Sequence, residues 1–300
     1  AVLEDEPYPV RGLMILGGSP VLSFPDSKSW REAYKKLDCL IVLDRYFTED
    51  ARYADVVFPA CSLFEVPKAV PGPEGPHIVE PLIEPVGESK NDVLIMGAIA
   101  KKLGFGDKLP QTEEELRSWL LSGTAPYAGD FGTSADQKKE KHYKKYETGE
   151  LRADGKPGFP TPSGKLEICS TILEENGFVP YPEYKDVRSI PELAGKEYPF
   201  TMTSGARSNN RMGVFGANLD KIAEIEPYPF VDINEEDAKE IGIKDGDMVK
   251  VITPFADGTF KAKIRGIARH AIHIPHGGGS AYMAEPWKNG NVNDLCSLDY

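Results

Sequence analysis

The pattern of hydrophobic and polar residues changes along the chain. In the first part, short apolar runs are separated by amphipathic stretches: GLMIL stops at Gly17, DCLIVLD ends at Asp44, and VVF stops at Pro59. SKSWREAYKKL, with Ser27 or Ser29 as N-cap, predicts a helix, and TEDARYAD predicts a shorter one. Strands and helices that alternate at this spacing predict a parallel α/β unit. Ligands of such sheets bind at the carboxyl ends of the strands.

Two more amphipathic stretches predict helices that cover this sheet. NDVLIMGAIAKKLG ends at Gly104, and TEEELRSWLL has Thr112 and Glu115 in capping-box spacing. From Ser122 to Gly164 the chain is rich in Gly, Pro, Lys and Asp, which predicts a linker with one charged helix, QKKEKHYKKYE. The lysines of that helix could bind a partner or simply face solvent.

From about Lys196 the pattern becomes short β segments divided by Gly and Pro. The segments PFTMTSG, DMVKVITP, GTFKAKIRG and AIHIPHG predict a small β-barrel. One helix interrupts them, with Asn234 as N-cap and Gly242 at its end. We therefore expect an α/β domain at residues 1–122, a connecting segment at 123–195 and a barrel domain at 196–300.

Many carboxylates lie in residues 230–251, FVDINEEDAKEIGIKDGDMVKV. Glu235, Glu236 and Asp237 fall in the first turn of the predicted helix, where negative charge complements the helix dipole. The DGD sequence that follows is typical of a tight turn. A calcium loop that began at Asp232 would need a glycine where Asp237 stands. We interpret this acidic stretch as scaffold.

Composition and charge exclude several classes of function. The net charge of −12 over 300 residues disfavours nucleic acid as a partner. No run approaches the roughly 18 apolar residues of a membrane span. The cysteines, Cys39, Cys61, Cys169 and Cys296, are scattered without CxxC pairs, which argues against zinc and against a disulfide-rich scaffold.

Several segments together match the sequence pattern of one enzyme family. GLMILGGSPVLSFPD resembles the family's Gly-Gly-Asn-Pro turn, and VLDRYFTEDARYADVVFPACSLFE resembles its D-x-F-x-T-E-T-x-x-x-A-D-V-V-L-P segment with a trailing Glu. TPSGKLEI resembles the link into the family's barrel, and PYPFVDINEEDAKEIGIKDGDMVKVITP resembles the barrel itself. HGGGS and GNVNDL resemble its closing segments. The matches cover most of the chain, in order, and the chain thus resembles the molybdopterin-dinucleotide oxidoreductases of the dimethyl sulfoxide reductase superfamily.

The resemblance implies a Rossmann-like parallel-sheet unit followed by a double-psi, aspartate-decarboxylase-like barrel. Together they would hold molybdopterin guanine dinucleotide with molybdenum or tungsten. The Gly-Gly turn would approach a phosphate, Asp44 would bind the guanine edge, and Arg207 would bind a phosphate or a pterin carbonyl. The full set of cofactor-binding residues implied is Gly17, Gly18, Ser19, Asp44, Thr48, Asp55, Ser204, Gly205, Ala206, Arg207, His276, Gly277, Asn291 and Asn293. Thr48 and Asp55 are expected on the same rim as Asp44.

Each of these interpretations has a plainer alternative. The Gly-Gly turn could simply stop a strand, Asp44 could cap a helix, and Arg207 could form a surface ion pair. His273 and His276 have metal-ligand spacing, but no third ligand is near them in sequence, so a histidine that bonds to the backbone is favoured.

The chain also departs from the family pattern. Ser19 replaces the usual Asn, Asp50 replaces a Thr, and Pro76 replaces an Arg. These changes remove two donors and place a negative charge near the expected phosphate rim.

The resemblance implies two-electron oxidation or reduction of a small substrate in a full-length enzyme, of which this chain is the C-terminal, cofactor-binding part. A 4Fe–4S cluster is expected only in a missing N-terminal part, and an iron–sulfur electron-transfer subunit is a possible partner. The chain by itself should be inactive, since it has no cluster motif and no metal ligand.

Three matters stay open at this stage. A non-catalytic structural relative, as in the large iron–sulfur subunit of respiratory complex I, is the main alternative, and a stand-alone interaction protein is another. EPYPFVDIN most resembles the branch that acts on thiosulfate, polysulfide, arsenate or tetrathionate. The compartment is cytoplasmic or periplasmic, depending on an upstream signal.

Overall fold

The computed structural model describes residues 1–72, 75–122, 144–184, 186–191, 193, 197–205, 219–283 and 285–297. The chain divides into two compact units. The first comprises Ala1–Val66, Pro81–Leu116 and Val187–Tyr300, and the second comprises Pro67–Glu80 and Arg117–Asp186. The division at residues 122 and 195 stays a prediction.

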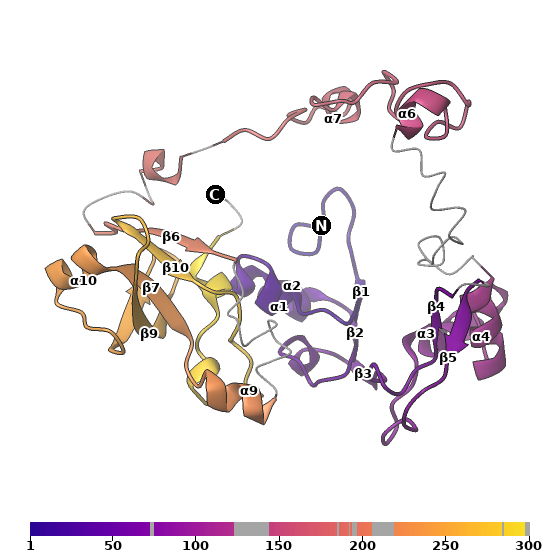
Figure 1. Ribbon diagram of the computed structural model, residues 1–300, viewed down its shortest axis with the longest axis horizontal. Helices are drawn as coiled ribbons and strands as arrows, with labels where there is room; N and C mark the ends of the chain where they lie inside the picture. Colours follow the sequence, from indigo (N-terminus) through magenta and orange to yellow (C-terminus); the bar gives the residue numbers. More distant parts are fainter. Residues whose placement is uncertain are drawn as a thin grey trace. The chain divides into compact units, whose positions relative to one another are not determined.

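The N-terminal part of the first unit is a parallel sheet in the order β1-β2-β3 (Figure 1). Its strands are β1 (Gly12–Leu16), β2 (Cys39–Asp44) and β3 (Val56–Pro59). Helices α1 (Pro20–Ser23) and α2 (Ser27–Lys36) connect β1 to β2, and the 3₁₀ turn η1 (Asp50–Arg52) connects β2 to β3. All neighbouring strands are parallel. The strands predicted from the apolar runs are confirmed.

The predicted N-cap of α2 is wrong. Asp26 caps the helix, because its carboxylate accepts a hydrogen bond from the Ser29 backbone N–H at 3.1 Å. Ser27 is the first helical residue, and its side chain is buried. Asp and Ser are both good caps, so sequence preference alone did not separate these adjacent positions.

The core of the α/β part contains two residues from the far end of the chain. Met283 and Trp287 pack with the buried residues of the sheet and its helices, namely Ile15, Val21, Leu22, Tyr34, Leu40, Val42 and Ala51. The indole N–H of Trp287 donates to the Glu226 carbonyl at 2.9 Å. The segment after the second sheet is therefore part of the α/β core.

The two predicted helices are present as α3 (Asp92–Lys102) and α4 (Glu113–Leu121), with the short turn η2 (Gly106–Lys108) between them. Among the described residues, neither helix contributes to the hydrophobic core of the parallel sheet, so their role as covers of that sheet stays a prediction. Asn91 caps α3 through the Val93 N–H at 2.9 Å. The capping box of α4 is half formed. Thr112 accepts from the Glu115 N–H at 3.2 Å, but the Glu115 carboxylate accepts from Gln111 N–H rather than from that of Thr112.

The C-terminal part of the first unit is a curled five-stranded sheet in the order β6-β10-β7-β9-β8 (Figure 1). The strands are β6 (Thr201–Ser204), β7 (Phe230–Asn234), β8 (Met248–Ile252), β9 (Asp257–Arg265) and β10 (Ala271–Ile274). The β6–β10 and β7–β9 pairs are parallel, and the others are antiparallel. The predicted segments are confirmed as strands, and β7 is an additional one. A double-psi topology stays a prediction.

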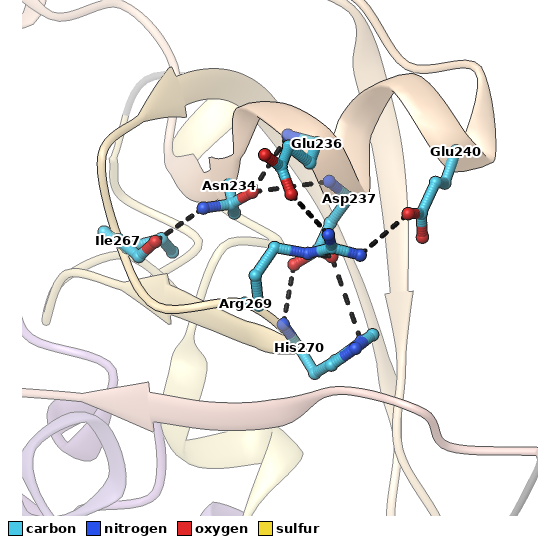
Figure 2. Close-up of polar contacts among 7 residues, drawn as sticks. All are labelled: Asn234, Glu236, Asp237, Glu240, Ile267, Arg269 and His270. Carbon is cyan, nitrogen blue, oxygen red and sulfur yellow. Dashed lines mark hydrogen bonds and ion pairs between the residues drawn. The ribbon is translucent and has the colours of Figure 1, made fainter.

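The acidic stretch serves as scaffold, as predicted. Helix α10 (Glu235–Ile241) is capped by Asn234, whose side chain accepts from the N–H groups of Glu236 and Asp237, and it ends at Gly242. Figure 2 shows Arg269 bonded to the carboxylates of Asp237, Glu236 and Glu240. The Asp237 carboxylate also accepts from the His270 N–H at 2.7 Å. These bonds fix α10 to the loop before β10.

The second unit contains the antiparallel pair β4 (Lys68–Val70) and β5 (His77–Val79), and the short helices α6 (Lys145–Thr148) and α7 (Thr171–Glu175). In TPSGKLEI, the Glu167 carboxylate accepts from Ser163 and Thr171. Only residues 144–147 of the predicted charged helix lie within the described residues.

The remaining elements of the first unit are η4 (Val187–Ser189), α9 (Asp220–Ile225), η5 (Glu285–Trp287) and η6 (Val292–Leu295). No helix among the described residues is both long and apolar enough to cross a membrane.

Candidate functional site

The Gly17–Ser19 turn lies at the carboxyl edge of the parallel sheet. Gly17 has φ +59°, a left-handed conformation that favours glycine, and its N–H donates to the Leu43 carbonyl at 2.9 Å. The N–H groups of Leu22 and Ser23 return to the Ser19 carbonyl. Among the described residues, nothing accepts from the N–H groups of Gly18 and Ser19. The turn therefore contains two backbone donors without an acceptor among the described residues, one of them on the buried Ser19.

Asp50 supports this turn from inside the protein. Its side chain is fully buried, at 0% exposure, and accepts from the Ser19 hydroxyl, from the Val21 N–H at 3.1 Å and from the Tyr34 hydroxyl at 2.7 Å. Asp50 therefore places a negative charge next to the glycine turn, as predicted, but the carboxylate is buried and accepts from three donors of the chain itself. Burial, followed by the Asp50 carboxylate, raises the pKa of Tyr34, so this phenol stays a donor.

Asp44 lies at the carboxyl end of β2, as predicted. One of its oxygens accepts from the Tyr46 N–H at 3.0 Å, which makes a local turn, and burial raises the pKa of the carboxyl group. A carboxylate has about four lone-pair sites, so Asp44 can still accept from a ligand. The position fits the predicted contact with a base.

Thr48 and Asp55 have structural partners. The buried Thr48 hydroxyl accepts from the Ala51 N–H of η1 at 3.3 Å. The Asp55 carboxylate accepts from the Leu40 N–H at 2.7 Å. Leu40 is near the start of β2 and Asp44 is at its end, so Asp55 does not share the rim with Asp44. That placement was wrong, because Asp55 closes the connection from η1 to β3 at the other edge of the sheet.

Parallel register brings two predicted segments of the second sheet together. Ser204, the last residue of β6, pairs with Ile274, the last residue of β10. Gly205 and His276 therefore follow neighbouring strands at one edge of the sheet. Ser204 and Gly205 are exposed, His276 is half-buried and Gly277 is buried. Ala206 and Arg207 lie outside the described residues.

The two asparagines near the chain end bind the α/β part. The Asn291 amide donates to the Val21 carbonyl at 3.3 Å and to the Ser27 hydroxyl at 2.9 Å. The Asn293 amide donates to the Leu22 carbonyl at 2.6 Å. Both residues are buried. Their amide groups thus satisfy carbonyls of α1, and both N–H bonds of the Asn291 amide are in use.

The closing segment, which runs from the HGGGS sequence to the GNVNDL sequence (residues 276–295), makes two further contacts with the α/β part. The sequence did not reveal these contacts. Gly279 has φ +96°, and a Cβ atom there would lie 2.4 Å from the Asn291 Cβ and 3.0 Å from a Leu22 methyl group. The buried Glu49 accepts from the Ala281 N–H at 3.2 Å. The three glycines of HGGGS indicate that the backbone there packs closely against another segment, but the sequence does not show which segment that is.

The histidine pair does not form a metal site with other residues that the structure describes. The His273 ring lies 3.1 Å from the Thr203 hydroxyl of the neighbouring strand. Across the described ranges, no group of three or more His, Cys, Asp or Glu side chains could hold a metal ion.

The site thus combines backbone donors at a glycine turn with a carboxylate on the adjacent strand. Backbone N–H groups suit an anion such as a phosphate, and a carboxylate suits paired N–H donors on a base. The backbone donors and the carboxylate acceptor together fit the phosphate and the base of a nucleotide. Thr48, Asn291 and Asn293 shape the site through structural bonds.

Two family models match the chain in the same order as these parts. The model described as "Molybdopterin oxidoreductase" matches residues 5–102. The model described as "Molydopterin dinucleotide binding domain" matches residues 201–300. The first contains the glycine turn and Asp44, and the second contains the five-stranded sheet and the closing segment.

Relatives and a solved structure agree with these matches. A formate dehydrogenase alpha subunit from Methanocaldococcus jannaschii is 30% identical over 285 residues, which is 91% of this chain and 39% of that protein. Acetylene hydratase from Syntrophotalea acetylenica is 25% identical over 286 residues, 92% of this chain and 38% of that protein. The solved structure of acetylene hydratase from Pelobacter acetylenicus matches with a TM-score of 0.75 and 23% identity, over 98% of this chain and 42% of that one. The chain spans about two fifths of the length of these relatives.

Proposed function

Because this chain belongs to the molybdopterin oxidoreductases of the dimethyl sulfoxide reductase superfamily, we propose that it binds the guanosine end of a molybdopterin guanine dinucleotide. The observation that carries the proposal is the pairing of the Gly17–Ser19 turn with Asp44 at one edge of the sheet. Leu43, the neighbour of Asp44, accepts the hydrogen bond from the Gly17 N–H at 2.9 Å, so the two features are held in register.

Each feature has a separate task in this proposal. The N–H groups of Gly18 and Ser19 bind a phosphate oxygen, and the absence of a Cβ at Gly18 lets the phosphate approach the backbone. The Asp44 carboxylate accepts from the N1–H and the exocyclic amino group of guanine. Adenine lacks the N1–H donor, so Asp44 favours guanine over adenine.

The whole protein would use its bound cofactor for two-electron chemistry on a small substrate, with molybdenum or tungsten as the metal. The residues of this chain would bind and orient the cofactor, and metal ligands and a 4Fe–4S cluster would be supplied by other parts of the protein. An iron–sulfur subunit is the partner we propose for electron transfer.

One observation favours a second candidate, a structural relative without a metal. The side chains of Thr48, Asn291 and Asn293, which the resemblance assigned to the cofactor, are occupied by bonds within the chain. A fold that keeps these bonds stays intact whether or not a cofactor is present.

A nucleotide titration tests the proposal. Binding of guanosine monophosphate (GMP) and of adenosine monophosphate (AMP) is measured by saturation-transfer NMR for the unaltered chain, Asp44→Ala and the isosteric Asp44→Asn. We expect tighter binding of GMP than of AMP, and loss of that preference in both variants. Equal binding of the two nucleotides by the unaltered chain contradicts the proposal.

A further inference from the structure

An aromatic pair joins the α/β part to the closing segment beside this site. The rings of Phe47 and Tyr282 meet edge to face, with centroids 5.0 Å apart and an interplanar angle of 75°. Phe47 follows the carboxyl end of β2, and Tyr282 follows the HGGGS run. The pair is thus formed by residues from both matched family segments.

The backbone beside both rings is held by hydrogen bonds and by burial of neighbouring residues. Two residues after Phe47, the buried Glu49 accepts from the N–H of Ala281, the residue before Tyr282. The Tyr282 N–H donates to the hydroxyl of Ser280, a residue that is itself buried. The next residue, Met283, is buried in the α/β core. The backbone on either side of the ring pair is therefore held by burial and hydrogen bonds.

The rings nonetheless stay half exposed, at 49% for each residue. Edge-to-face packing covers only part of each aromatic surface, so flat apolar faces remain accessible. Asp44 lies three residues before Phe47, and Leu43 bonds to the glycine turn. A half-exposed aromatic pair on anchored backbone therefore lies at the sheet edge that carries the proposed phosphate donors and base acceptor.

We propose that Phe47 and Tyr282 form a stacking platform for the purine ring at this edge. This inference rests on the proposed function and adds the element that binds the face of the base, whereas Asp44 binds its edge. Aromatic side chains stack on any base, since every base has a π-face. The platform should therefore strengthen binding of guanine and adenine nucleotides alike, while Asp44 alone distinguishes between them.

This division of roles predicts a distinctive pattern of losses. Leucine replacements of Phe47 and Tyr282 keep an apolar side chain but remove the ring. Loss of one stacked ring typically weakens nucleotide binding by about tenfold. Ribose 5-phosphate has the phosphate but no base, so its binding should not change.

The test is a titration of the 300-residue chain with GMP, AMP and ribose 5-phosphate. The variants are Phe47→Leu, Tyr282→Leu and the conservative Tyr282→Phe, and thermal unfolding is measured for each. Phe105→Leu is the matched control, because Phe105 is 46% exposed and lies just after α3. We expect about tenfold weaker binding of both nucleotides by the leucine variants, and unchanged binding by Tyr282→Phe and Phe105→Leu.

The outcomes separate this inference from the proposed function. If the unaltered chain prefers GMP but the leucine variants bind both nucleotides as tightly as it does, the platform is wrong and the proposed function stands. If it binds GMP and AMP equally and the leucine variants weaken both, the guanine-binding role fails and the platform stands. Equal weakening of ribose 5-phosphate overturns the platform, because the variants would then act on the whole site. Binding of neither nucleotide overturns both proposals.

Discussion

The hydroxyl of Ser19 donates a hydrogen bond to the buried carboxylate of Asp50. These are two of the positions at which the chain departs from the sequence pattern of its family. Considered separately, they predict a lost donor and an added charge at the phosphate rim. In the structure they contact each other, and the carboxylate also accepts from Val21 and Tyr34. The two departures are therefore coupled: the hydrogen bond between Ser19 and Asp50 stabilises the glycine turn from the interior of the protein.

Asp50→Asn should destabilise the protein. An amide presents only one accepting oxygen to the three donors and turns its own N–H group toward one of them. Unsatisfied buried donors cost roughly 1–3 kcal/mol each, so we expect a loss of roughly 2–3 kcal/mol in the free energy of unfolding. Urea denaturation measures this loss of unfolding free energy. The Tyr34→Phe variant, which removes a single hydrogen bond to Asp50, should lose less unfolding free energy than Asp50→Asn. Equal stability of Asp50→Asn and the unaltered chain would show that the network contributes nothing.

Asn291→Asp should loosen the closing segment. The change is isosteric, but it replaces the amide that donates to the Val21 carbonyl with an acceptor. Two oxygens that face each other in a buried site leave both unsatisfied, at a cost of about 1–3 kcal/mol. Protonation of the new carboxyl group restores a donor, so the loss should shrink at low pH. Urea titrations at several pH values measure this dependence, and a loss that does not change with pH would contradict it.

Gly279→Ala should be far more damaging than Gly17→Ala. Both glycines have positive φ, and a left-handed alanine costs about 1–2 kcal/mol at either position. At Gly279 the added Cβ also meets Asn291 at 2.4 Å, whereas at Gly17 nothing lies within 4 Å. Thermal unfolding of the two variants isolates the steric term. Similar melting temperatures would contradict the close packing of the closing segment against α1.

Glu65 should contribute a pH-dependent part of the stability. Hydrogen bonds from the Ser62 side chain and from the N–H groups of Ser62 and Val86 lower the pKa of its carboxyl group to about 2. The value in an unfolded chain is about 4.3. Because the folded pKa is the lower one, the stabilisation is complete above about pH 5 and is lost as pH falls toward 2.

Glu65→Gln isolates this contribution. The difference in unfolding free energy between the unaltered chain and the variant should be largest near neutral pH and should shrink between pH 5 and pH 2. A difference in unfolding free energy that stays constant over this range would show that folding does not lower the pKa of Glu65. Glu84→Gln, a change at an exposed position of the same unit, serves as the control.

Much of the fold could be predicted from local sequence patterns. Strands β1, β2 and β3 are apolar runs that end at Gly, Asp or Pro. The two ends of α10 could be predicted from its N-cap residue Asn234 and from Gly242. β7 was not singled out, because FVDIN runs directly into the cap of α10. The choice between Asp26 and Ser27 as a cap depends on side-chain direction, which one-dimensional patterns do not contain.

The site was less predictable than the fold because its side chains have distant partners. The position of Asp44 followed from the end of a strand. In contrast, Asn291 and Asn293 bond to carbonyls 270 and 271 residues earlier in the chain. Their motif indicated donors but not the acceptors. Asp55 was misplaced for the same reason, since its partner is a backbone N–H at the start of β2.

We propose above that this chain holds the guanosine end of a molybdopterin dinucleotide in a larger protein. The most direct measurement is the cofactor content of the full-length polypeptide that carries it, with GMP released by acid hydrolysis and molybdenum or tungsten determined by mass spectrometry. We expect GMP together with one of these metals, and a marked loss of both in the Asp44→Ala variant. A folded full-length protein that contains neither GMP nor metal would contradict it.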